Sequence, residues 1–350
     1  MTSETPFEGA TPVAAPDPSS AEWVRILARY REPNTLRSVF EILVTLVPFV
    51  GLWAISWALL AVHPVLSALV ACLNGLFLVR LFCIQHDCGH GSFFAHRKVS
   101  DWVGRGLGVL TLTPYDVWRK SHAMHHSHAG NLGRRGIGDV MTLTVTEYQS
   151  RSRLGRMRYR LYRHPFVLFV LGPAYLFYVE NRLPFGQLNG GWRIWLSSGG
   201  TTLGVLATVA AVFWFGGLSA AAFIFLPTTL VAATLGVWLF YVQHQFEVTH
   251  WDQPDDWNMH DAALHGSSHY VLPKWLQWCT ANIGIHHVHH LYSRIPFYRL
   301  TEVLRDHAPL AEAQRLSIAE SIACARLHLW DEQQRRLLSF AEARQTYAVA

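Results

Sequence analysis

The sequence predicts an all-α integral membrane protein, with four transmembrane helices in two hairpins and a cytosolic helical cap. Of the 350 residues, 51% are hydrophobic and only 15% are charged, whereas about a quarter of the residues in soluble proteins are charged. Two long segments contain no Asp, Glu, Lys or Arg. The chain also contains 20 histidines, and many of them are grouped close to the ends of these two segments. These three observations define the fold class and the region where function is expected.

Each charge-free segment is long enough for a pair of helices, because one helix needs about 20 predominantly apolar residues to cross the hydrocarbon. The first segment, Ile42 to Val79, is interrupted at His63-Pro64. The second, Ile194 to Phe246, has a Gly-Gly-Leu-Ser break at residues 216–219. A large buried core in a soluble protein is the alternative, but soluble helices rarely run so far without a charge. We therefore expect two helical hairpins.

Basic residues predict the orientation of these hairpins in the membrane. Between Arg80 and Arg163, Lys and Arg clearly outnumber Asp and Glu, whereas neither hairpin turn contains Lys or Arg. Segments rich in Lys and Arg remain on the cytoplasmic side. We therefore expect both termini, the middle segment and the histidines on the cytoplasmic side.

The rest of the chain is divided by composition. Residues 1–20, rich in Pro, Ser, Thr and Ala, are expected to form a disordered arm. Residues 21–300 are expected to form the membrane domain with its cap, and residues 301–350 a cytosolic helical tail. Ala21–Arg31 suits either an interfacial amphipathic helix or an ordinary surface helix. Phe166–Val179 is too short to span, so we expect it to dip into the interface or pack on the bundle.

Two further features have simple interpretations. Gly104, Gly106 and Gly108 resemble part of a dinucleotide-binding fingerprint, but no strand precedes them, which favours helix packing. Glu247 to Asp261 carries several acids and no Lys or Arg, which indicates a solvated loop or, as the alternative, a docking patch for a basic partner.

Three histidine clusters point to the chemistry of the protein. They span residues 86–90, 122–126 and 286–290. Helix positions i, i+3 and i+4 share one face, so each cluster can direct two or three imidazoles to one point. The pattern HxxHH occurs twice, which composition alone does not explain. The predicted metal ligands are His86, His90, His122, His125, His126, His286, His289 and His290.

Eight imidazole nitrogens are too many for one ion and enough for two. The topology brings all three clusters to one side of the membrane, and His244, at the end of the fourth span, is a ninth candidate ligand. His265 and His269 are candidates for the substrate pocket or for supporting the ligands. Asp87 is a candidate to orient His86, although its helix position lies on a different face. The other histidines are expected to be ordinary core or surface residues: His63, His96, His128, His164, His250, His260, His307 and His328.

Iron suits these ligands better than zinc if the substrate is an unactivated methylene. No acid or base side chain removes hydrogen from such a carbon, so this reaction needs a metal cofactor that activates O₂. Zinc binds the same nitrogens but has no redox chemistry.

At these residues the sequence resembles the membrane fatty acid desaturase family, with its three histidine boxes HxxxH, HxxHH and HxxHH. The resemblance runs from about Leu81 to Leu300. The segments His86–Phe94 and His289–Pro296 are similar to the acyl-lipid branch of the delta-12 or omega-6 type. The resemblance implies four spans, a cytosolic cap and a di-iron centre held by the eight box histidines, with His244 as an extra ligand.

The resemblance also implies the reaction and its partners. Such an enzyme uses O₂ and two electrons to introduce a cis double bond into the acyl chain of a membrane lipid. The chain has no His-Pro-Gly-Gly haem-binding segment, so we expect no bound haem or flavin and a separate donor, a ferredoxin or a b-type cytochrome. The basic stretch Arg151–Arg163 is a candidate docking site for an acidic ferredoxin or for anionic lipid head groups, or only a topology signal. No nucleic acid partner is expected.

Two alternatives remain open from the sequence. A di-iron hydroxylase or ketolase that acts on a carotenoid or an alkyl chain would have the same boxes and would leave oxygen in its product. A membrane metal transporter or sensor would need ionisable residues along an ion path, and the predicted spans contain almost none.

Overall fold

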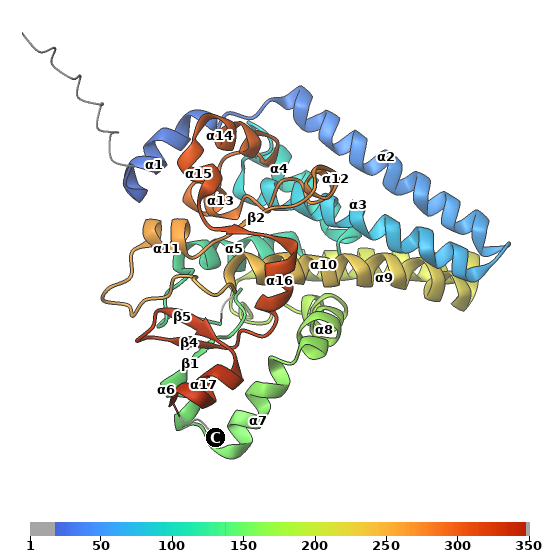
Figure 1. The fold of residues 1–350 in the computed structure, drawn as a ribbon. Coiled ribbons are helices and arrows are strands. Elements are labelled where there is room, and N and C mark those ends of the chain that lie inside the picture. The colour runs from blue at the N-terminus through green and yellow to red at the C-terminus, as the bar shows by residue number, and fades with distance from the viewer. Residues whose placement is uncertain (1–17, 137, 348–350) are drawn as a thin grey trace, which may run out of the picture.

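The computed structural model describes residues 18–136 and 138–347. Long apolar helices extend to one side of the molecule, and short helices and strands gather at the other (Figure 1). The long helices are α2 (Thr35–Leu60), α3 (Pro64–His90), α9 (Trp192–Ala220) and α10 (Leu226–His244). The short α-helices before α9 are α1 (Ser20–Leu27), α4 (Arg97–Leu110), α5 (Tyr115–His128), α6 (Val145–Ser150), α7 (Arg153–Tyr162) and α8 (Gly172–Tyr178). Those after α10 are α11 (Met259–His265), α12 (Lys274–Cys279), α13 (His286–Leu291), α14 (Leu300–Asp306), α15 (Ala308–Glu312), α16 (Ile318–Cys324) and α17 (Phe340–Tyr347).

Three helical stretches in the described part of the chain are long and apolar enough to cross a membrane. They are Thr35–Leu60, Pro64–His90 and Trp192–His244. The first two are separated at the predicted break, where His63 caps α3 by accepting the Val65 N–H through Nδ1 at 3.2 Å. These apolar helices indicate association with a membrane.

The third stretch of 53 residues folds back on itself. A straight helix of that length would be about 80 Å long, whereas the 14-residue helix α5 is about 21 Å long. Both ends of the stretch nevertheless contact α5: Ser197 Oγ accepts the Asp116 N–H at 3.1 Å, and His244 Nε2 lies 3.1 Å from His125 Nε2. The break lies at Gly217, with φ 60° and ψ −157°, inside the predicted Gly-Gly-Leu-Ser segment. A π-helix, η4 (Ala221–Phe225), joins α9 to α10.

Small and polar residues hold the long helices together. Asn74 of α3 donates to the Phe49 carbonyl of α2 at 3.0 Å, and Thr228 of α10 donates to the Ala71 carbonyl of α3 at 3.1 Å. Gly75 of α3 lies so close to α10 that an added Cβ would be 2.8 Å from the Val231 side chain. Small residues and interhelical hydrogen bonds of this kind drive helix association where water is absent.

The described residues are mostly helical, as predicted, and they also form five short strands that the all-α prediction did not include. β1 (Leu143–Thr144) pairs in parallel with β4 (Leu329–Asp331), which pairs antiparallel with β5 (Arg336–Leu338). β2 (His269–Tyr270) pairs in parallel with β3 (Arg315–Leu316). The predicted helical tail, residues 301–350, therefore supplies three strands within its described part, up to residue 347. Its apolar residues pair with distant strands, a contact that local helical spacing does not reveal.

We call the short helices and strands beside the ends of α3 and α10 the cap, and the N-terminal helix α1 packs on it through α11 and α13. It begins with a capping box between Ser19 and Glu22, so the last residues of the predicted disordered arm are ordered, while residues 1–17 lie outside the described part. Trp23 and Leu27 are buried, and the Trp23 ring centroid lies 5.2 Å from that of His307. The 3₁₀-helix η1 (Ala28–Tyr30) follows. The apolar face of this segment is covered by protein, which favours the surface-helix interpretation.

The segment 166–179 packs on the bundle, which was one of its two predicted positions. It forms the π-helix η2 (Val167–Leu171) and α8, and the 3₁₀-helix η3 (Glu180–Arg182) follows. The Phe169 ring centroid lies 4.9 Å from that of Trp238 and 5.1 Å from that of Tyr241, both on α10.

The two simpler sequence features also have definite positions. Gly104 allows close helix packing, because an added Cβ would lie 2.2 Å from the Tyr115 ring. The acidic segment 247–261 is mostly a loop, but Asp252 is nearly buried and pairs with Arg335 at 2.8 Å.

The 3₁₀-helix η5 (Phe297–Arg299) lies between the third histidine cluster and α14.

Candidate metal centre

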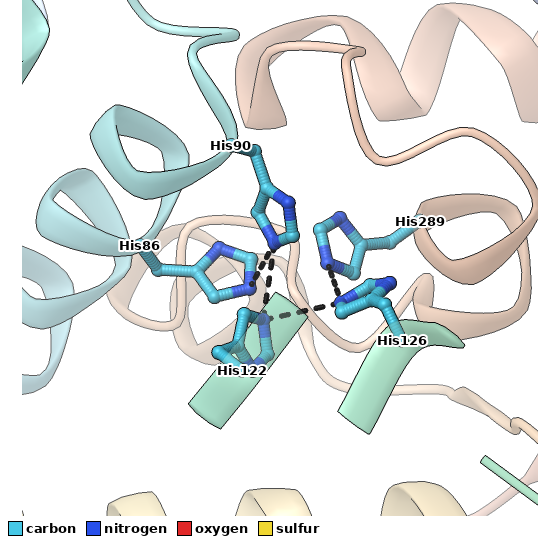
Figure 2. Close-up of side chains that lie close together, drawn as sticks. All are labelled: His86, His90, His122, His126 and His289. Atoms are coloured by element: carbon cyan, nitrogen blue, oxygen red, sulfur yellow. Dashed lines mark hydrogen bonds between the residues drawn. The ribbon is translucent and has the colours of Figure 1, made fainter. Parts of the chain in front are cut away.

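Five histidines converge at the end of α3. His86 and His90 come from the last turns of α3, His122 and His126 from α5, and His289 from α13 (Figure 2). One ring nitrogen of each lies within 4.8 Å of the others. We call this group cluster 1.

Four further histidines form cluster 2. His125 comes from α5, His244 from the last residue of α10, and His286 and His290 from α13, and all four are buried. The same limit of 4.8 Å applies to their ligand nitrogens. All nine predicted histidines therefore lie in one of the two clusters.

The spacing of the HxxHH boxes explains this division. Positions i and i+4 of α5, His122 and His126, face cluster 1, while His125 points to cluster 2. On α13 the pair at i and i+4, His286 and His290, faces cluster 2, and His289 points to cluster 1. The clusters are adjacent, since the His126 and His290 rings stack with their centroids 4.0 Å apart. Each HxxHH box thus serves both clusters.

Neighbouring nitrogens are separated by the distances expected around a metal ion. At a metal–nitrogen distance of about 2.1 Å, two ligands at right angles lie about 3.0 Å apart. In cluster 2, His244 Nε2 lies 3.1 Å from His125 Nε2 and 3.0 Å from His286 Nε2. In cluster 1 the Nε2 separations are 3.3 Å for His86 and His90, 3.0 Å for His90 and His122, 3.1 Å for His122 and His126, and 3.2 Å for His126 and His289.

Hydrogen bonding between the imidazoles does not account for these contacts. Nε2 of a neutral imidazole either donates or accepts one hydrogen bond, so the consecutive contacts of cluster 1 cannot all be hydrogen bonds. In cluster 2, neither ring nitrogen of the buried His290 has a hydrogen-bond partner. A cation placed between the rings would satisfy all of these lone pairs at once, so the residues present fit two metal ions.

Burial keeps the imidazoles in the form that binds metal. The pKa values of His122, His126, His286, His289 and His290 are held well below their ordinary value, first by burial and then by the neighbouring histidines. A buried imidazole resists protonation because the charged form loses its hydration. Neutral imidazole is the metal-ligating form of histidine.

Two acceptors fix the orientation of cluster 2. The Asp139 carboxylate accepts a hydrogen bond from Nδ1 of His125, and the Gly266 carbonyl accepts one from Nδ1 of His244 at 3.2 Å. With the proton on Nδ1, each ring presents the Nε2 lone pair to the cluster. Asp139 was not predictable from the sequence, because it lies in a loop and no periodic spacing links it to His125.

Two contacts support cluster 1. Asp87 lies with Oδ1 3.3 Å from Nδ1 of His86, while its Oδ2 accepts the Phe297 N–H at 2.7 Å. The carboxylate thus reaches the outer nitrogen of the ring without sharing its helix face. Trp118, also missed from the sequence, stacks on His122 with ring centroids 4.6 Å apart and 16° between planes.

The other histidines have different environments. His269 donates from Nδ1 to the Ala311 carbonyl at 3.1 Å, and the His265 ring lies 6.2 Å from that of His250. His287, inside the third box, donates from Nε2 to the Leu310 carbonyl at 2.8 Å. Within the described residues, His265, His269 and His287 lie outside both clusters. The eight histidines that were predicted to be ordinary also lie outside them.

Comparison with known proteins identifies the family. The sequence model described as fatty acid desaturase matches residues 63–321, which include both clusters. The chain is 39% identical over 314 residues to a fatty acid desaturase of Bacillus subtilis, covering 90% of this chain and 89% of that protein. It is 29% identical to an sn-1 oleoyl-lipid 12-desaturase of Synechocystis, over 65% of this chain and 64% of that protein. An sn-1 acyl-lipid omega-3 desaturase (ferredoxin) of the same genus is 26% identical, over 80% of this chain and 77% of that protein. The chain belongs to the fatty acid desaturase family.

Proposed function

We propose that this protein is an oxygen-dependent desaturase that introduces a cis double bond into the acyl chain of a membrane lipid. One observation carries the proposal: two adjacent clusters of nitrogen ligands lie at the ends of long apolar helices. The names of the Synechocystis relatives, which act on acyl-lipids, support the substrate class.

The metal site is proposed to hold two iron ions. Bound iron would supply the activation of O₂ that removal of hydrogen from an unactivated methylene requires. The chain contributes the ligand positions and the tautomers set by Asp139 and Gly266. The proposed ligands are His86, His90, His122, His126 and His289 for one ion, and His125, His244, His286 and His290 for the other.

In the proposed arrangement four spans carry the site at the cytoplasmic face. The fold-back at Gly217 would make the third apolar stretch a second hairpin. The excess of Lys and Arg between residues 80 and 163 supports a cytoplasmic location of the histidine boxes. Both termini would lie on the same side.

The basic helix α7 suits a membrane surface. Its arginines are accompanied by exposed apolar residues at helical spacing, Leu154, Met157 and Leu161, which are 50%, 61% and 63% exposed. A basic helix that also exposes an apolar face binds anionic lipid surfaces. Within the stretch Arg151–Arg163, we therefore assign the exposed Arg151, Arg153 and Arg158 to anionic lipid head groups. Arg163 is buried and donates to Gln245 inside the protein. Electrons would come from a separate donor, and the name of one relative contains ferredoxin.

The proposal is tested by expressing the chain in a bacterial host fed a monounsaturated fatty acid and analysing total lipids by gas chromatography with mass spectrometry. We expect a new double bond with the wild-type protein and none with His125→Ala. The matched control is His128→Ala, since His128 lies on the same helix and bonds to the Met124 carbonyl at 3.0 Å. An oxygenated product would instead identify a hydroxylase or ketolase. A double bond that His125→Ala still makes would contradict the proposed site.

A further inference from the structure

A large groove runs along α4, α5 and the beginning of α9. Its volume is about 1250 Å³, which exceeds the range of about 300–1,000 Å³ for pockets that bind small molecules. The groove is lined by His90 and His122, two of the proposed iron ligands. A molecule that fills the groove would therefore reach cluster 1.

The walls of the groove are suited to a hydrocarbon chain at a membrane surface. Trp102 and Trp192 line it and are 71% and 69% exposed, and exposed tryptophans are typical of the membrane–water interface. Trp118 lines the groove beside His122. Gly106 and Gly200 also line it, and an added Cβ at either would meet no atom within 4 Å. Glycine thus leaves space where a larger side chain would narrow the groove.

The charges along the groove leave two cations without a carboxylate partner. Arg105 pairs with Asp116 at 2.9 Å, and Arg97 and Arg119 share Asp101 at 3.2 and 2.8 Å. The groove also contains Lys120 and Arg193, both exposed. Among the residues that the structure describes, neither of these two has a carboxylate within ion-pair distance.

The position of the two cations matches a lipid head group. Arg193 is the second residue of α9, where the third apolar stretch begins, and its guanidinium lies 5.5 Å from the Trp192 ring centroid. Lys120 lies on α5 two residues before His122. A cation at the end of an apolar helix, beside an interfacial tryptophan, lies at the level of lipid phosphates, as Arg193 does. Lys120 lines the same groove.

We propose that the groove binds one acyl chain of a phospholipid and that Lys120 and Arg193 bind its phosphate. An anionic head group complements the two unpaired cations, and the aromatic walls lead the chain towards His90 and His122. This inference rests on the proposed function, because it takes the bound chain to be the one that is desaturated. It makes Lys120 and Arg193 specificity-determining residues for the head group.

Photocrosslinking tests the site without turnover. The purified full-length protein in uncharged detergent is labelled with phosphatidylglycerol that carries a diazirine on an acyl chain, and labelled peptides are mapped by mass spectrometry. We expect labels between residues 97 and 120 and between 190 and 201. The double variant Lys120→Gln/Arg193→Gln should lower this labelling about tenfold or more, because it removes both cations that are proposed to bind the phosphate. Labelling by the same chain on uncharged diacylglycerol should not change.

Two further variants provide controls. Lys98→Gln removes an exposed charge of α4 outside the groove and should not change labelling. The charge-preserving variant Lys120→Arg/Arg193→Lys should retain most of it. Three outcomes would each overturn the inference. Labels could be confined to other segments, or the wild type and the glutamine variant could be labelled equally. The coenzyme A thioester of the same chain could also label the protein more strongly.

Desaturation measured in cells separates the two proposals. A new double bond formed by a protein whose labels lie elsewhere would refute the groove site alone. Labels in the groove of a wild-type protein that makes no double bond would contradict the proposed function and leave the lipid site standing.

Discussion

At the scale of single residues, Asp139 has the clearest role in shaping the metal centre. Its carboxylate accepts a hydrogen bond from the Nδ1–H of His125, and His125 is 1% exposed. Because a carboxylate only accepts, this contact keeps Nε2 of His125 unprotonated and directed at His244. Asp139 belongs to neither HxxHH motif, yet it fixes the tautomer of the predicted ligand His125.

Asp139→Ala should weaken iron binding about 10- to 100-fold, as loss of such an outer partner does in other metal sites. The measurement is competition for iron against a chelator of known affinity, together with the iron content of the purified protein. Asp139→Asn should retain part of the affinity, since its amide oxygen can still accept a hydrogen bond from the Nδ1–H of His125. The exposed Asp256 supplies a control, Asp256→Ala. Equal affinity of Asp139→Ala and wild type would refute the role of Asp139.

At the scale of elements, the contact between α4 and α5 holds the groove and cluster 1 together. Gly104 of α4 lies against the Tyr115 ring, and Tyr115 donates from its hydroxyl to the Cys88 carbonyl of α3 at 2.9 Å. Oδ1 of Asp101 lies 2.8 Å from the same hydroxyl and is a second acceptor for its one proton. Three helices that supply groove and ligand residues are thus joined at one tyrosine.

Gly104→Val should destabilise the protein by about 1–3 kcal/mol, because the added side chain would displace the Tyr115 ring. Thermal unfolding in detergent, followed by circular dichroism, provides the measurement. The matched control is Gly106→Ala on the same helix, which meets no atom within 4 Å and should keep or slightly raise the stability, since Ala favours the helix over Gly by about 1 kcal/mol. Equal melting temperatures for the Gly104→Val protein and wild type would rule out this packing constraint.

At the scale of the whole molecule, the two clusters connect the apolar helices to the cap. Their ligands come from α3, α5, α10 and α13, which lie far apart in the sequence and meet where the long helices end (Figure 1). Metal bound there would cross-link the long apolar helices α3 and α10 to α5 and α13.

Removal of iron by a chelator should therefore lower the stability of the whole fold. Ligand that binds only the folded state stabilises it by about 2.7 kcal/mol at a free concentration of 100 times Kd, so the melting temperature should fall on chelation and recover when iron is added. His128→Ala should respond like wild type, and His290→Ala should lose much of the response. A melting temperature unaffected by iron in the wild-type protein would contradict the proposed cross-link.

The long helices, the two breaks at His63-Pro64 and near Gly217, and the nine histidines that converge were all predictable from the sequence alone. These features are local: apolar run length and the i, i+3, i+4 periodicity of a helix are visible in one segment at a time. His244 was predictable because the end of a hairpin returns to the side where the chain began.

Tertiary packing was needed to show which face of each HxxHH box contributes to which cluster, that Asp139 supports His125, and that the tail pairs through β3 and β4 with distant strands. It also decided that α1 buries Trp23 on the cap and that His265 and His269 lie outside the clusters. Each of these depends on contacts between segments far apart in the sequence. Which side chains meet across such a contact depends on how the elements pack, and the spacing of residues within one segment does not show it.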